Sequence, residues 1–165
     1  MTTSSPCSIL AGVATFVLLA ACGQQEAGPV LADEPAMDTA PAAAPALPRT
    51  ASADGARVFF ITPADGDTVT NPVSIEFGIE GMSVVTAGVN DMHSGHHHLL
   101  VDTGSPDLGL PIPADANHIH FGDASTSTEL TLEPGQHTLR LLLGDHLHIP
   151  HDPPVFSDTI TITVE

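Results

Sequence analysis

Histidines spaced two residues apart are the feature of this sequence that most directly indicates chemistry. The pattern His-x-His occurs three times, in His96-His97-His98, His118-Ile119-His120 and His146-Leu147-His148. In a β-strand, residues i and i+2 share a face about 6.6 Å apart, so two such imidazoles can tilt onto one ion at about 2.0–2.1 Å per bond. Pairs from neighbouring strands, whose facing Cβ atoms lie within about 5 Å, can complete a site of four nitrogens.

The distribution of the histidines supports the same interpretation. All ten lie between residues 93 and 151, and none lies in the first third of the chain. Apolar residues alternate with the histidines of each pair along the chain. In a strand, the apolar side chains can therefore enter a core while the paired imidazoles face outward. The pattern predicts a metal site with candidate ligands His96, His98, His118, His120, His146, His148 and His151. Secondary candidates are His93, Met92 and Asp145.

Two histidines are not predicted to be ligands. His97 has the parity of the core residues Leu99 and Val101, and His137 shares parity with Leu139 and Leu141. Aspartates beside the histidines are expected mainly to orient imidazole N–H groups.

The candidate site has no thiolate, because Cys7 and Cys22 both lie in the N-terminal apolar segment. Nitrogen-rich ligand sets of this kind favour copper or zinc. The sequence therefore predicts a domain that binds, buffers or delivers one of these ions, without predicting turnover. Two alternatives stay open: a histidine-ligated metalloenzyme of zinc-hydroxide or copper redox type, and an envelope interaction domain without metal.

The net negative charge of the chain argues against binding to nucleic acid or to anionic lipid. The chain has 20 acidic residues against three basic ones, for a formal net charge of −17. Such a field repels nucleic acid and anionic lipid headgroups and attracts cations. The expected partner is a transition-metal ion, with membrane contact only through a lipid anchor.

The N-terminus predicts export. Residues 8–22 read SILAGVATFVLLAAC, an apolar run with the length of a secretory signal rather than a spanning helix. Its end, Leu19-Ala20-Ala21-Cys22, resembles the lipobox of bacterial lipoproteins. This resemblance implies a signal peptide over 1–21, lipidation of Cys22 and a place in the periplasmic cell envelope, with Gly23 favouring the outer membrane. An ordinary signal peptide is the alternative.

The remaining chain divides into a tether and a domain. Residues 22–56 are rich in Ala and Pro without apolar periodicity, which predicts a disordered tether. From residue 57 to 165, short alternating segments between turn signals predict an all-β, immunoglobulin-like sandwich of about seven strands, with a small β-barrel as the alternative. The expected strands are 57–61, 73–79, 97–102, 117–121, 129–132, 137–143 and 159–164.

Three long blocks of the domain carry a family resemblance. GMSVVTAGVNDMHSGHHHLLVD, PIPADANHIHFG and EPGQHTLRLLLGDHLHIPHDPPV resemble a bacterial exported family known as domain of unknown function 4399. The resemblance covers about residues 58–165 and implies that the histidine blocks form one unit. It implies no activity.

Overall fold

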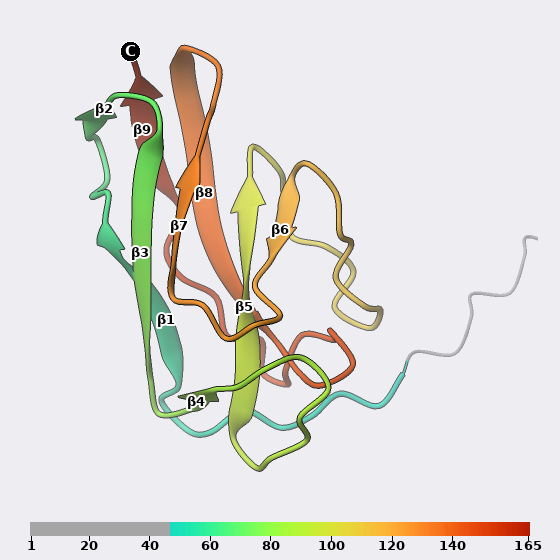
Figure 1. Ribbon diagram of the computed structural model, residues 1–165. Helices are drawn as coiled ribbons and strands as arrows, with labels where there is room; N and C mark the ends of the chain where they lie inside the picture. Colours follow the sequence, from blue (N-terminus) through green and yellow to red (C-terminus); the bar gives the residue numbers. More distant parts are fainter. Residues whose placement is uncertain (1–46) are drawn as a thin grey trace, which may run out of the picture. The chain divides into compact units, whose positions relative to one another are not determined.

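The structure is a computed structural model that describes residues 47–165. The predicted signal peptide, Cys22 and most of the predicted tether lie outside the described residues. Within them the chain forms nine β-strands and no helix, and so no helix there could cross a membrane (Figure 1). The strands are β1 (Arg57–Thr62), β2 (Thr68–Val69), β3 (Val73–Glu80), β4 (Ser83–Val84), β5 (Ser94–Val101), β6 (His118–His120), β7 (Ser127–Leu130), β8 (Gly135–Gly144) and β9 (Ile160–Val164).

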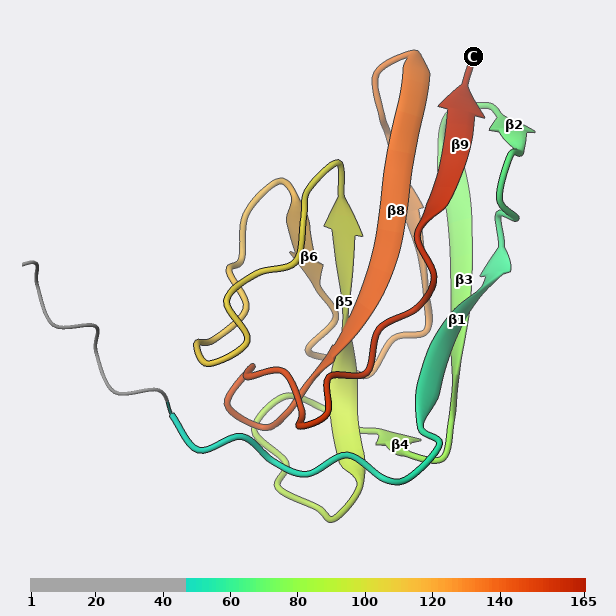
Figure 2. The ribbon, with the colours of Figure 1, turned by 180° about the vertical axis from the view of Figure 1, so that it is seen from behind.

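The strands form two sheets. A three-stranded sheet has the order β1-β3-β7, and a six-stranded sheet has the order β2-β9-β8-β5-β4, with β6 paired to β5. In Figure 1 β7 passes in front of β8 and β3 passes in front of β9, and Figure 2 shows β8 and β9 from the opposite side. The sheets do not close into a barrel, so the predicted β-sandwich is confirmed.

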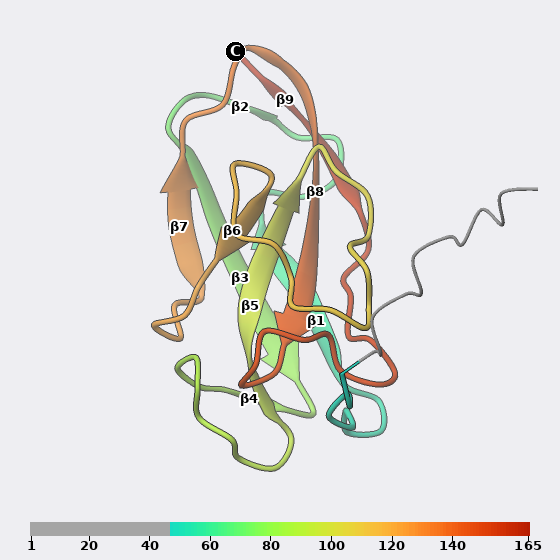
Figure 3. The same cartoon turned by 90° about the vertical axis from the view of Figure 1, so that its right-hand side faces the viewer.

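Alternating apolar residues build the core between the sheets. In β3 the side chains of Val73, Ile75 and Phe77 are buried while the residues between them are exposed. Leu139 and Leu141 of β8 approach from the large sheet and join the same cluster. Figure 3 shows the strands of the two sheets from the side. The period-two pattern thus decides which face of each strand packs inward.

The seven predicted strands are all present, with ends shifted by a few residues. The structure adds the two-residue strands β2 and β4, which are too short to show a periodic pattern. β5 differs from the other strands because it is buried along its whole length. Its inner face belongs to the core, and on its outer face Leu100 packs with Leu142 and with Ile112 from the following loop. The outer face of β5 is therefore covered by loops.

Candidate metal centre

His96 and His98 lie on the covered outer face of β5. The side chains are 0% and 1% exposed, and their Nε2 atoms are 3.1 Å apart. Two nitrogens bound to one ion at about 2.0–2.1 Å lie about 2.8–3.4 Å apart when the ligand angle is between about 90° and 109°. The pair therefore already has the separation of two ligands of one metal ion.

Strand register brings a third histidine to this pair. β6 runs antiparallel to β5 with His120 opposite His98 and His118 opposite Leu100. One potential ligand atom from each of His96, His98 and His120 lies within 4.8 Å of the others. The two buried imidazoles and the more exposed His120 can hold a metal ion.

His148 reaches the same place from the loop that follows β8. Its ring centroid is 4.9 Å from that of His96, 4.8 Å from that of His120 and 6.0 Å from that of His98. The His148 backbone is left-handed, with φ of 65°, a conformation that a non-glycine residue adopts only when its surroundings impose it. We call His96, His98, His120 and His148 the histidine cluster.

Asp145 imposes that loop conformation. Its buried carboxylate accepts hydrogen bonds from the N–H groups of Leu147 (2.8 Å) and Ile149 (3.0 Å), on either side of His148. The His148 N–H donates to the Asp145 carbonyl (2.9 Å), and the Thr50 hydroxyl donates to the Asp145 carboxylate (2.6 Å). Burial raises the pKa of Asp145, but these hydrogen bonds outweigh it and the net pKa is lowered. Asp145 is therefore an ionised group that shapes the loop.

Two glycines make room for the imidazoles. A Cβ at Gly144 would lie 2.9 Å from His98 Nε2, and a Cβ at Gly122 would overlap the His120 ring, with 2.8 Å to its Nε2. These positions need glycine because the rings pack directly against the backbone. Gly122 follows His120 by two residues in the NHIHFG block, a signal that the sequence analysis did not use.

Burial favours the neutral form of His96, His98 and His120. Burial first, and then the nearby imidazoles of His148 and His120, lowers the pKa of His96 to about 4. Burial and the neighbouring His96 lower the pKa of His98 further, to about 2. Burial and the neighbouring His148 lower the pKa of His120. Metal binding requires neutral imidazoles, and the lowered pKa values keep these three imidazoles neutral near pH 7.

Hydrogen bonds within the described residues do not account for this burial. The Nε2–Nε2 contact of His96 and His98 is the one hydrogen bond that links rings of the cluster. The Nδ1 atoms of both residues are buried and have no partner among the described residues. Burying polar atoms in this way costs about 1–3 kcal/mol each, unless another interaction offsets it.

The other predicted ligands lie outside the cluster. His118 Nδ1 contacts Asp115 (2.9 Å), and His146 Nδ1 is 4.0 Å from the Asp145 carboxylate. His151 is buried, with Nε2 3.1 Å from the Ser94 carbonyl and Nδ1 3.4 Å from the Leu143 carbonyl. The two secondary candidates His93 and Met92 are exposed, and Asp145 serves the loop.

The two histidines with core parity differ from each other. His97 lies in the core with its ring edge-on to Phe77 at 4.7 Å between centroids. His137 lies at the start of β8, where Nδ1 contacts Asp102 (2.6 Å) and Nε2 contacts the Glu133 carbonyl (2.7 Å). Neither ring belongs to the cluster.

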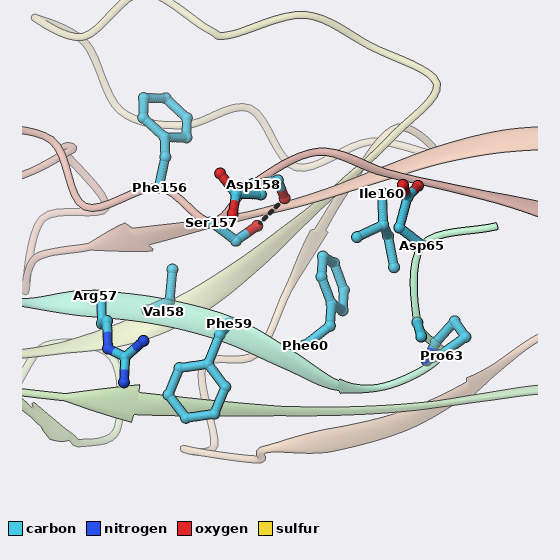
Figure 4. A pocket seen from close by; sticks show the side chains of 11 residues that line it. Arg57, Val58, Phe59, Phe60, Pro63, Asp65, Phe156, Ser157, Asp158 and Ile160 are labelled. Carbon is cyan, nitrogen blue, oxygen red and sulfur yellow. Dashed lines mark hydrogen bonds between the residues drawn. The ribbon is translucent and has the colours of Figure 1, made fainter. Parts of the chain in front are cut away.

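A separate pocket of about 370 Å³ lies between β1 and the segment before β9 (Figure 4). Phe60, Phe156 and Ile160 give it an apolar lining, and the Ser157 hydroxyl donates to the Asp158 carbonyl (2.7 Å). None of its lining residues is a histidine. The pocket is therefore not part of the metal centre.

The fold and the site define a β-sandwich that carries a buried histidine cluster. A family model described as domain of unknown function DUF4399 matches residues 75–165, more than half of the chain, and the chain belongs to that family. The match spans the three histidine blocks, in agreement with the resemblance noted in the sequence. Searches of curated proteins and of solved structures found no match.

Proposed function

We propose that the domain binds a transition-metal ion through His96, His98 and His120, with His148 as the fourth ligand. The observation that carries this proposal is the 3.1 Å separation of the Nε2 atoms of His96 and His98, with a His120 nitrogen close to both. One cation can bind all the ring nitrogens that converge here, whereas the hydrogen bond between His96 and His98 joins only two of them. Asp145, buried beside the cluster, adds a compensating negative charge.

The ligand set also supports an ion and a role. Imidazoles without thiolate favour copper or zinc. Four imidazoles fill a tetrahedral coordination shell, whereas a catalytic site keeps a position open for water or substrate. We therefore assign binding, buffering or delivery of the ion to this domain in preference to turnover.

The site of action is proposed from the sequence. The Leu19-Ala20-Ala21-Cys22 run supports export to the cell envelope and lipid attachment at Cys22. Replacing Cys22 by serine should move the protein from the membrane fraction to the soluble fraction of the envelope. Membrane association that survives this change would contradict the anchor.

The decisive experiment uses the His-x-His motifs as matched pairs. His120→Gln and His148→Gln each remove a proposed ligand, and His118→Gln and His146→Gln remove the other histidine of the same motif. Affinity for Cu(II) and Zn(II) should fall in the first two by more than the about 10–100-fold typical of an outer-sphere change. The two controls should bind like the wild type.

Isothermal titration with a competing chelator measures these affinities, and circular dichroism confirms the fold. Equal losses in both members of a pair would contradict the assigned ligands. A folded wild-type protein that binds neither ion near neutral pH would overturn the proposed function.

A further inference from the structure

The segment Arg49–Ser52, which we call the N-terminal strap, is hydrogen-bonded to residues 150–153, which directly follow the turn that carries His148. The Arg49 Nε donates to the Pro150 carbonyl (2.9 Å), and its terminal nitrogens reach the His151 carbonyl and the Asp152 carboxylate (3.2 Å). The backbone also pairs, with the Asp152 N–H donating to the Thr50 carbonyl (2.9 Å). In Figure 1 the strap passes close to the loop that follows β8.

One side chain of the strap reaches into the loop that carries His148. The Thr50 hydroxyl donates to one oxygen of the Asp145 carboxylate at 2.6 Å. The other oxygen accepts the N–H groups that flank His148, from Leu147 and Ile149. A continuous set of hydrogen bonds therefore joins the strap to the left-handed backbone of His148.

We infer that the strap is part of the metal site, with Thr50 a positioning residue that acts on His148 through Asp145. This inference rests on the proposed function. The left-handed conformation of His148 is intrinsically unfavourable, so the loop keeps it only while its hydrogen bonds are made. Docking of the strap and metal binding at His148 therefore stabilise each other, and by thermodynamic linkage each increases the affinity of the other.

The location of the strap gives this linkage a consequence. Residues 49–52 lie in the Ala/Pro-rich stretch that connects the domain to the N-terminal part of the chain. A metal ion bound at His148 thus strengthens the attachment of the connecting chain to the domain at this point, and loss of the ion weakens it. The metal occupancy of the domain therefore affects how firmly its connecting segment is docked.

The first test compares isosteric changes in the full-length chain. Thr50→Val removes the hydroxyl and keeps the side-chain shape, Thr50→Ser keeps the hydroxyl, and Ser52→Ala removes only a hydrogen bond to the Pro153 carbonyl. Thr50→Val should weaken Cu(II) binding about 10-fold, as expected for an outer-sphere partner. The Cu(II) electron paramagnetic resonance spectrum should show altered coupling to one imidazole nitrogen, because His148 is still bound but shifted from its place.

Thr50→Ser and Ser52→Ala should keep the wild-type affinity and spectrum. Wild-type affinity and an unchanged spectrum in Thr50→Val would overturn the inference, while the proposed function would stand. Absence of binding in the wild type would instead remove the proposed function itself.

The second test reads the linkage in the opposite direction. Hydrogen exchange at the amides of Ser52 and Asp152, which join the strap to the loop, should slow when Zn(II) is added to the wild type. In His148→Gln, which keeps three proposed ligands, Zn(II) should leave this exchange unchanged. Equal slowing in both proteins would overturn the linkage.

Discussion

His97 is the imidazole whose burial the metal proposal does not explain. Its neighbours His96 and His98 belong to the histidine cluster, whereas His97 is on the opposite side of β5, against Phe77. Both of its ring nitrogens are buried and have no partner among the described residues. His97 is therefore a polar side chain in an apolar environment that would suit leucine.

Replacing His97 by leucine should stabilise the protein. Removing two unsatisfied polar atoms should raise the free energy of unfolding by about 1–2 kcal/mol, since each such atom costs about 1–3 kcal/mol and part of the gain is lost with the Phe77 contact. Urea unfolding of the metal-free protein measures the difference. Metal affinity should not change, because the side chain points away from the cluster.

The difference in unfolding free energy between the His97→Leu variant and the wild type should grow as the pH falls. Burial lowers the pKa of His97 from 6.5 to about 4 in the folded protein. The unfolded chain therefore takes up a proton at this position as the pH falls below 6.5, while the folded chain does not, and stability is lost. The leucine variant lacks this loss. A variant that is less stable than the wild type at every pH would show that His97 has a polar partner.

At the scale of the strand, the alternation of residue types predicted which side chains share a face, but it did not predict the register between neighbouring strands. The His-x-His spacing places His96 and His98 on one face of β5, as expected from the sequence. Which histidine of β6 joins them depends on the pairing of His120 with His98, a long-range relation that no local pattern encodes. His118 therefore lies two residue pairs further along, opposite Leu100.

Loop geometry was even less predictable. His146 and His148 have strand spacing in the sequence, but they follow β8 in a turn, where side chains do not alternate. The turn depends on Asp145 and on Thr50, which is 95 residues away in an Ala/Pro-rich stretch. A contact between such distant residues leaves no periodic signal, so the roles of Arg49 and Thr50 could not be predicted from the sequence.

The pairing of β8 with β5 yields a prediction about Gly144. Gly144 lies opposite His96, and an added Cβ would lie 2.9 Å from His98 Nε2. Gly144→Ala should push the His98 ring from its place and weaken Zn(II) binding by about 10-fold or more. Overpacking should cost about 1–3 kcal/mol of stability as well.

Gly104→Ala is the matched control, because no atom lies within 4 Å of a Cβ added there. Its affinity, measured by the same chelator competition, should equal that of the wild type. Unchanged Zn(II) affinity in Gly144→Ala would show that the His98 ring does not need its present position to bind the ion.

At the scale of the whole molecule, the histidines give stability two opposite dependences on pH. Burial lowers the pKa of His96, His97 and His98, and the metal-free fold therefore loses stability as the pH falls below 6.5. His137 acts in the opposite direction. The two effects occupy different pH ranges, which allows each to be measured alone.

The contacts of His137 favour its imidazolium form. Its Nδ1 contacts the Asp102 carboxylate and its Nε2 contacts the Glu133 carbonyl, so both nitrogens must carry hydrogen to be satisfied. The hydrogen bond with Asp102, followed by that with Glu133, raises the pKa of His137 above 6.5. The stabilisation is therefore complete below pH 6.5, the unfolded value, and is lost as the pH rises through the folded pKa.

His137→Gln tests this sign. The metal-free wild type should lose about 1 kcal/mol of unfolding free energy as the pH rises from about 6.5 through the folded pKa, a value reduced from that of a fully buried charged pair because Asp102 is partly exposed. The variant should lack this loss and keep the acid-side loss caused by the buried histidines. Urea unfolding at a series of pH values, with chelator present, separates the two. An alkaline loss of equal size in the variant would show that another group causes it.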